Sequence, residues 1–92
     1  MTSRTVAIDG TEFYINEGHN YVGEVGTTRK WSPRHPRGFK LQCRDGLHWQ
    51  HVGLTSFGDF GADMHQAREL ADRWCEKARK AWDALKADDL AC

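Results

Sequence analysis

The sequence predicts an α+β fold, in which an antiparallel sheet of four to five strands has one long C-terminal amphipathic helix packed on one face. Two observations carry this prediction. All 9 glycines precede Asp63, and the stretch from Asp63 to Asp89 holds neither glycine nor proline. Before Asp63, short segments alternate apolar with polar residues and are bounded by turn residues, a pattern typical of strands.

The first two strands are predicted around an Asp9-Gly10 turn, which joins residues 5–8 to residues 11–15 as a hairpin. A two-residue turn gathers the apolar side chains on one face, so the turn and the pattern agree. That face would carry Val6, Ile8, Phe13 and Ile15. A third strand is expected around residues 20–25, although two glycines weaken it.

A second hairpin is predicted around an Asp45-Gly46 turn, between strands at residues 38–43 and 47–52. A two-residue loop at this turn would scatter the apolar side chains over both faces. A three-residue loop that begins at Arg44 gathers them on one face. Its pairs are Cys43 with Leu47, Leu41 with Trp49, and Phe39 with His51. We therefore predict a G1 bulge with Gly46 in the left-handed conformation.

The helix is predicted over residues 63–89, because Asp63 and Gln66 have the spacing of a capping box and apolar residues follow a 3.6-residue period. The apolar face holds Met64, Ala67, Leu70, Ala71, Trp74, Cys75, Ala78, Ala81, Trp82 and Leu85. Favourable charge pairs are Glu69–Arg73 and Glu76–Lys80. Such a helix would be about 39 Å long against a domain of about 30 Å, so we expect Trp82 and Leu85 to be exposed at its end.

A chain of 92 residues predicts a single domain. Its parts would be a sheet over 1–53 with a basic loop at 29–38, a connecting loop at 54–62, and the helix. No apolar stretch approaches the roughly 20 residues of a membrane span, and the N-terminus lacks the apolar region of a signal peptide. The 3 cysteines are widely spaced, which argues against a disulfide framework. We expect a cytoplasmic protein with no membrane partner.

Formal net charge is zero, but the charges are segregated, with a run of bases and no acid between residues 29 and 44. Bases interleaved with an aromatic ring suit a phosphate backbone with a stacked base, or an acidic protein surface. The bland alternative is a solvated loop lying against acidic segments of the same chain. The candidate partner-binding residues are Arg29, Lys30, Trp31, Arg34, His35, Arg37, Lys40 and Trp82.

No constellation predicts catalysis, a metal or a cofactor. His48 and His51 are three apart on a strand and point to opposite faces, so they do not easily share one zinc ion. Ser56 lies near His51 and Asp59, but neither an exposing turn nor an oxyanion-hole glycine pattern surrounds it. Cys43, which might otherwise pair with His51, is expected on the core face, where a thiol is inert. We therefore expect a protein that is not an enzyme.

Four aromatic residues outside the predicted strands could lie either in the core or at an interface. Phe57 and Phe60, in the glycine-rich segment 55–61, are expected to fold back as plugs at the open end of the core. A flexible aromatic recognition loop is the alternative. On the helix, Trp74 is expected in the core, while Trp82 is balanced between core and interface.

The first functional hypothesis is a small protein-binding module that uses loop 29–40 and the helix end to occlude a site on a larger host complex. In size and in its lack of a catalytic motif, the chain resembles the stand-alone accessory proteins that phages encode against host machinery. Anti-CRISPR inhibitors are among these. No residue motif carries this resemblance, and the neutral net charge supports it over a dedicated nucleic-acid binder.

The alternative is a nucleic-acid-binding domain that uses the basic aromatic loop 29–40. A small sheet followed by a helix, with residues 60–71 roughly matching F-x-x-x-x-A-x-x-L-A, resembles the arm-binding domains of phage integrases. A homodimer, with Trp82 and Leu85 packing across a two-fold axis, is compatible with either hypothesis.

Overall fold

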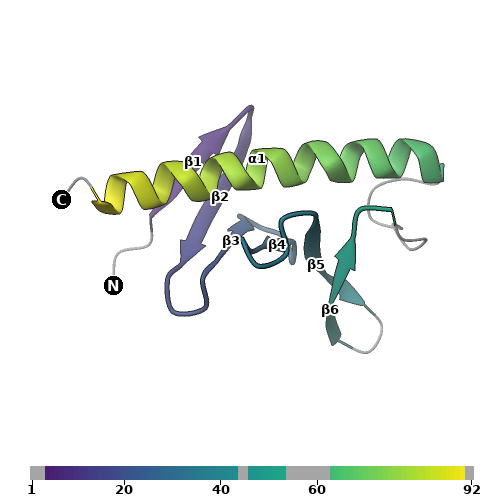
Figure 1. Ribbon diagram of the computed structural model, residues 1–92, viewed down its shortest axis with the longest axis horizontal. Coiled ribbons are helices and arrows are strands. Elements are labelled where there is room, and N and C mark those ends of the chain that lie inside the picture. Colours follow the sequence, from purple (N-terminus) through teal and green to yellow (C-terminus); the bar gives the residue numbers. More distant parts are fainter. Residues whose placement is uncertain (1–3, 44–45, 54–62, 91–92) are drawn as a thin grey trace.

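The computed structural model describes residues 4–43, 46–53 and 63–90, which form one antiparallel sheet of six strands followed by one helix (Figure 1). The strands pair in chain order. They are β1 (Thr5–Ile8), β2 (Thr11–Asn16), β3 (Tyr21–Glu24), β4 (Lys30–Trp31), β5 (Gly38–Cys43) and β6 (Gly46–His51), and the helix is α1 (Met64–Leu90). The α+β class is confirmed. The expected strand count was too low, because residues 30–31 of the predicted basic loop pair with β3 and β5.

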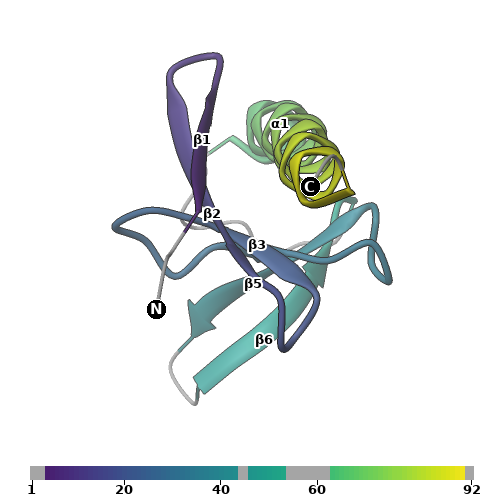
Figure 2. The same ribbon diagram turned by 90° about the vertical axis from the view of Figure 1, so that its left-hand side faces the viewer.

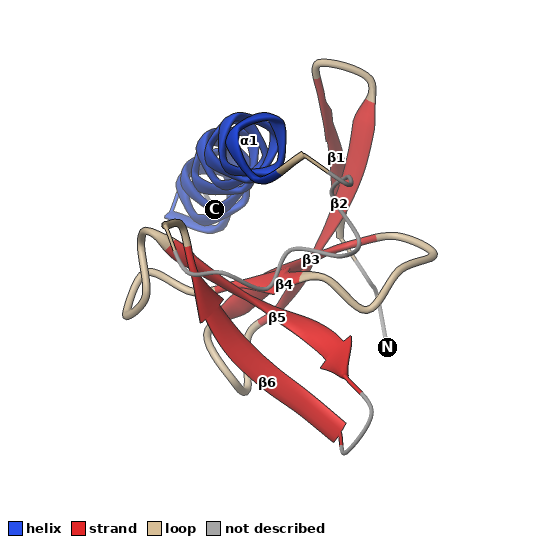
Figure 3. Cartoon of the chain, turned by 90° about the vertical axis from the view of Figure 1, so that its right-hand side faces the viewer, coloured by secondary structure: helices blue, strands red, loops and turns tan. Residues whose placement is uncertain are grey.

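Helix α1 runs along one face of the sheet and packs against β1, β2, β3 and β4 (Figure 1). Viewed along the helix axis, the β1–β2 hairpin stands beside α1 while the remaining strands pass beneath it (Figures 2 and 3). The strong twist of the sheet therefore wraps it around two sides of the helix. The other face of the sheet is covered by no helix of the described chain.

The β1–β2 hairpin has the predicted register. Asp9 and Gly10 have φ angles of 49° and 85°, the positive values that a type I′ turn needs at both central positions. Ile8 pairs with Thr11, and just beyond the far end of the hairpin the Ile15 N–H donates to the carbonyl of Arg4, the residue before β1. The turn and the apolar alternation specify the same hairpin here, so the local prediction succeeds.

The core lies between the sheet and α1. Its buried residues are Phe13, Val22, Trp31, Phe39 and Leu41 from the strands, and Ala67, Ala71, Trp74, Cys75, Ala78, Ala81 and Leu85 from the helix. The small side chains let the helix backbone approach the sheet. Trp74 fills the space between Phe13 and Phe39, with ring centroids 5.9 and 6.0 Å away. Burying each large side chain contributes about 1.5–3 kcal/mol to folding.

The start of α1 follows the prediction, because the Asp63 carboxylate accepts the N–H of His65 at 2.9 Å as an N-cap. The exposure expected for Leu85 near the other end is wrong. Leu85 is only 4% exposed. Arg4, the residue before β1, donates to the Leu85 carbonyl at 3.1 Å, so this turn of the helix is held against the chain that leads into the sheet. Conversely, Met64 and Leu70 of the predicted apolar face are exposed.

The predicted register of β5 and β6 is also wrong. Cys43 pairs with Gly46, so only residues 44 and 45 connect the two strands and there is no three-residue loop. The register differs by one residue from the prediction, which moves every side chain of β6 to the other face. Trp49 therefore pairs with Lys40 and not with Leu41, and it lies on the face turned away from the core.

Several predictions concern residues that the structure does not describe. Segment 54–62, with the expected plugs Phe57 and Phe60 and with Ser56 and Asp59, lies outside the described residues. The same holds for the side chain of Cys43. Within the described part of the chain, α1 is too polar to cross a lipid bilayer.

Candidate functional site

A continuous row of paired residues crosses the sheet on the face turned away from α1, with one residue from each strand between β2 and β6. The row consists of Tyr14, Gly23, Lys30, Lys40 and Trp49, each paired with the next. In the same strands, the neighbouring Phe13, Val22, Trp31 and Phe39 are buried against the helix. Because side chains alternate along a strand, the row faces outward. We call this surface the outer face and these residues the outer row.

The β3 end of the outer face is built around Tyr21. Its hydroxyl accepts from Asn16 at 3.2 Å, and its ring meets that of Tyr14 edge to face with centroids 6.5 Å apart. The His19 ring, from the β2–β3 turn, stacks on the Tyr21 ring at 6.2 Å. The Lys30 ammonium lies 5.7 Å from the Tyr21 centroid, within the range of a cation–π interaction. We call Tyr21, His19 and Lys30 the tyrosine site.

Tyr14 is held in place by the glycine beside it. The hydroxyl end of its ring lies over Gly23, where a Cβ atom would come within 2.5 Å of the ring. Burial, reinforced by the neighbouring Tyr21, raises the pKa of the Tyr14 hydroxyl, which therefore stays protonated. Gly23 is thus needed for close approach, and it lets Tyr14 lie across the outer row.

The β6 end of the outer face is built around Trp49. The His35 ring, from the β4–β5 connection, stacks on Trp49 with centroids 4.3 Å apart and planes inclined by 28°. The Lys40 ammonium lies 5.4 Å from the centroid of the Trp49 ring. A backbone hydrogen bond of 2.9 Å from His35 to Ser32 holds the connection in a tight turn. We call Trp49, His35 and Lys40 the tryptophan site.

Lys30 and Lys40 are cross-strand partners on the same face. Like charges placed directly opposite each other are destabilising, so this pair is unfavourable for folding alone. Neither ammonium has a carboxylate partner within the described part of the chain. The outer face therefore presents concentrated positive charge between two groups of rings, an arrangement that attracts an anion.

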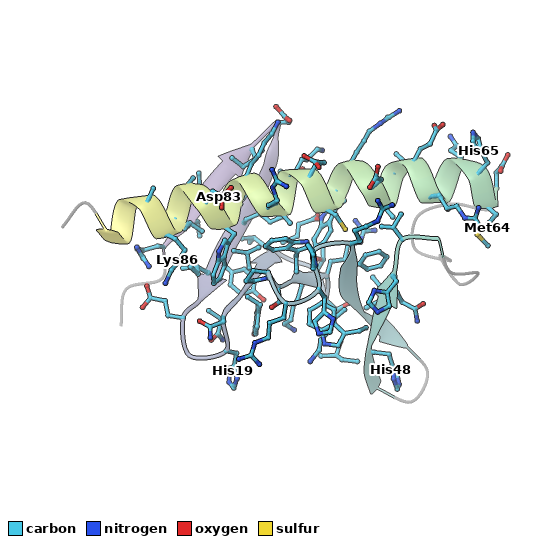
Figure 4. All side chains as sticks on the ribbon, viewed as in Figure 1. His19, His48, Met64, His65, Asp83 and Lys86 are labelled. Carbon is cyan, nitrogen blue, oxygen red and sulfur yellow. The ribbon has the colours of Figure 1, made fainter. Side chains whose placement is uncertain are left out.

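The acids nearest in sequence lie off the outer row. Glu12 is exposed two residues before Tyr14 on β2, so it shares the outer face but lies one step along the strand from the row. Glu17, in the β2–β3 turn, forms an ion pair with Arg4. Figure 4 shows His19 and His48 on the side of the molecule away from α1, but His48 pairs with the core residue Leu41 and so lies on the opposite face of β6 from Trp49.

The structure divides the predicted partner-binding residues between two sides of the sheet. Lys30, Lys40 and His35 come together on the outer face, as described above. Trp31 is only 1% exposed, and its indole N–H donates to the Pro36 carbonyl at 3.2 Å. It is a core residue and offers no ring for stacking. The two-residue strand β4 explains the split, because consecutive residues on a strand point to opposite faces.

Two of the predicted arginines, Arg29 and Arg37, lie away from the outer face. Arg29 turns toward the helix and lies 3.5 Å from the Glu24 carboxylate, which also accepts the Trp74 indole N–H at 2.7 Å. Arg37 lines a groove beside the start of α1. Arg34 is exposed in the turn between β4 and β5.

Trp82, the last predicted contact residue, is half-buried and packs against the core. The Lys86 ammonium lies 5.5 Å from its ring centroid. Trp82 is therefore remote from the outer face, and any contact that it makes with a partner belongs to a different surface.

Sequence reasoning missed four side chains of the site, Tyr14, His19, Tyr21 and Trp49. For the tyrosines a signal existed, since Tyr14 alternates with the predicted core residues Phe13 and Ile15 and must face the other way. Trp49 was missed because the predicted register paired it with Leu41 and so placed its ring in the core.

A groove of about 340 Å³ lies between α1 and the ends of β2, β3 and β4 that carry Thr11, Glu24 and Arg29. Its cations are Arg29, Arg73 and Lys77. Arg29 is paired with Glu24, and the Lys77 ammonium donates to the Thr11 hydroxyl at 3.4 Å. These contacts tie the helix to the sheet, so we assign the groove a structural role.

The described residues include one buried thiol, Cys75, and two histidines on β6. Burial, followed by the nearby Asp72 charge, raises the pKa of the Cys75 thiol from 9.0 to about 12, so it is a poor nucleophile. His48 pairs with Leu41 and His51 with Gly38, which places the two histidines on opposite faces as predicted. No group of three or more His, Cys, Asp or Glu side chains within the described segments could hold a metal ion.

Comparisons with known proteins do not add to this picture, because no family model, no curated protein and no solved structure matches the chain.

Proposed function

We propose that this chain is a non-enzymatic binding module that holds nucleic acid on the outer face of its sheet. One observation carries the proposal, namely the outer row with its two lysines between two groups of rings and no carboxylate within it. Lysines neutralise phosphates and aromatic rings stack on bases, so both halves of this chemistry meet in a nucleic acid.

The zero net charge is compatible with this role. At physiological ionic strength, charges farther apart than about 8 Å are largely screened from one another. Asp9 at the β1–β2 hairpin tip and the acids of α1 lie on other surfaces. Glu12 of the outer face is two strand spacings, about 10 Å, from the strand of Lys30, so a bound strand responds mainly to Lys30 and Lys40. A local positive patch is therefore sufficient for binding, although it limits the affinity.

A protein partner is the second candidate, and the phage-inhibitor hypothesis belongs here. Val25 and Leu47 are 44% and 41% exposed at the margin of the outer face, and exposed aliphatic groups favour a protein surface. An acidic protein could also pair with the lysines. However, it would not account for two sites that each combine stacked rings with a cation, so we rank it below nucleic acid.

The predicted homodimer was to pack Trp82 and Leu85 across a two-fold axis, and only Trp82 is accessible for such a contact. Leu85 is buried within its own chain, and only half-buried Trp82 is left of the proposed pair. Dimerisation through the helix end stays a prediction. It would leave the outer face open, because α1 lies on the other side of the sheet.

The proposal is tested by fluorescence anisotropy with labelled 30-nucleotide single-stranded DNA, RNA and duplex DNA between 50 and 200 mM salt. We expect binding that weakens with salt. The double variant Lys30→Gln with Lys40→Gln should lower the slope of log K against log[salt] by about 1.4 to 1.8, since each lost phosphate contact removes roughly 0.7 to 0.9.

The matched control is Arg79→Gln with Lys80→Gln, which removes the same charge from exposed positions of α1. We expect it to bind like the original protein. If no nucleic acid binds at 50 mM salt, or if the control loses as much affinity as the lysine variant, the proposal is wrong and the protein partner becomes the leading candidate.

A further inference from the structure

We infer that the nucleic acid on the outer face is single-stranded and stacks bases at both the tyrosine site and the tryptophan site. This inference rests on the proposed function, and it adds the number of strands and the positions of the bases.

The two sites are built alike. Each has an aromatic ring on a strand, a histidine from a neighbouring turn stacked on that ring, and a lysine ammonium beside the ring. In the tyrosine site the ammonium lies 5.7 Å from the Tyr21 centroid, and in the tryptophan site it lies 5.4 Å from the Trp49 centroid. The histidine rings are inclined by 21° and 28° to their partners. Hence each site already holds two flat groups face to face, as a ring and a base would lie.

This chemistry selects unpaired bases. In a duplex the faces of the bases are covered by their neighbours, and only the base edges are presented in the grooves. Edges are read by Arg, Lys, Asn or Gln side chains, whereas the outer row adds to its lysines the aromatic rings Tyr14 and Trp49, which do not read edges. Rings gain from a nucleic acid only when a base is free to stack on them. A duplex would therefore contact the two lysines through its phosphates, and the rings would have no base to stack on.

The spacing of the sites suits a short single strand. Tyr21 is on β3 and Trp49 is on β6, so three strand spacings of about 4.8 Å place them about 14 Å apart across the sheet. Sheets of four strands that bind RNA stack two or three bases over a comparable width. Lys30 and Lys40 lie on the two strands between the sites, where the phosphates that link the stacked bases would pass.

Each histidine marks where a base would enter. His19 and His35 are carried by turns and not by strands, so their rings can move without breaking a strand pair. A base either extends the existing stack or takes the place of the histidine on Tyr21 or Trp49. Both outcomes keep the base beside the lysine of that site.

The test uses the full chain and a labelled dT12 strand as the probe, with three competitors. These are unlabelled dT12, a 12-base-pair duplex, and a 12-unit abasic strand that keeps the phosphates but lacks the bases. We expect the duplex and the abasic strand to compete at least about tenfold more weakly than dT12, because loss of one base–ring stack lowers affinity about 5- to 150-fold. This measurement needs no variant.

Two variants locate the stacking. Tyr21→Leu and Trp49→Leu should each lower dT12 affinity about 5- to 150-fold and leave duplex affinity unchanged, with folding checked by circular dichroism. Equal competition by all three nucleic acids would overturn the inference while the proposed function survives as phosphate binding. Absence of binding by every probe would overturn both.

Discussion

The two faces of the sheet are made from the same strands but have opposite chemistry. The face under α1 buries apolar rings, and its polar groups, such as the Glu24 carboxylate and the Trp74 indole, are paired with each other. The outer face leaves rings half-exposed and carries two lysines as cross-strand partners, each with its ammonium beside a ring and without a carboxylate partner in the described chain. The first face is explained by stability, whereas the second pairs two like charges, an arrangement that an anionic ligand would stabilise.

The largest expected effect is on the covered face. Phe13 is fully buried against Trp74, so Phe13→Ala should lower the free energy of unfolding by about 3–5 kcal/mol. Urea denaturation measures the change. A loss below about 1 kcal/mol would mean that the helix does not pack on the sheet as described.

Leu85 provides the next test, because it decides between a helix end that packs and one that overhangs. It is 4% exposed, so Leu85→Ala should cost about 2–5 kcal/mol in urea denaturation. The nearby exposed Ala84 is a matched position, where Ala84→Ser should change stability by less than about 0.5 kcal/mol. If both substitutions change the free energy of unfolding by less than about 0.5 kcal/mol, Leu85 is exposed and the helix end overhangs the sheet.

Trp49 distinguishes the two registers of β5 and β6. On the outer face, Trp49→Leu should cost less than half of what Phe13→Ala costs, since the ring is only partly buried. In the predicted register the same ring would lie in the core. A loss of about 3–5 kcal/mol in urea denaturation would favour that register and remove the tryptophan site.

The reactivity of Cys75 tests whether the face under α1 is closed to solvent and to reagents. In a variant carrying Cys43→Ser and Cys92→Ser it is the only thiol, and it should react with a thiol reagent at pH 8 only after denaturation. Since burial raises its folded pKa from 9.0 to about 12, the stability that it contributes is complete below pH 9 and is lost as the pH rises toward 12. Rapid labelling of the native protein would show that the helix opens readily.

Gly23 is expected to give the smallest change in stability with a clear change in binding. A Cβ at this position meets the far end of the Tyr14 side chain, which can swing aside, so Gly23→Ala should cost little in folding. The displaced ring should disturb the tyrosine site and weaken dT12 binding by anisotropy. Full retention of affinity would show that the position of Tyr14 does not matter.

The sequence was sufficient for the elements whose local signals agree. Asp9-Gly10 specified a turn whose register matched the apolar alternation, and the Asp63 cap and the helical period bounded α1 within one residue at each end. The second hairpin failed because apolar burial was assumed to decide the register. Trp49 instead lies beside Lys40 and His35, and such an outward cluster depends on contacts between strands that no local pattern encodes.

The site was predicted only in part for a related reason. Treating residues 29–40 as one loop made their bases appear to share a surface, whereas β4 sends Lys30 outward and Trp31 into the core. The tyrosines lie far from that window in sequence and reach it only through the pairing of β2 with β3 and β3 with β4. A surface assembled across five strands is a property of the sheet and not of any one segment.

The most direct test of the account is a ¹H–¹⁵N NMR titration of the full chain with dT12. The account predicts that shift changes concentrate at the outer row and the two sites, including the indole N–H of Trp49, while exposed residues of α1 such as Arg79 stay unchanged. Changes that instead cluster along α1 and the groove around Arg73 and Lys77, with the outer row unaffected, would contradict it.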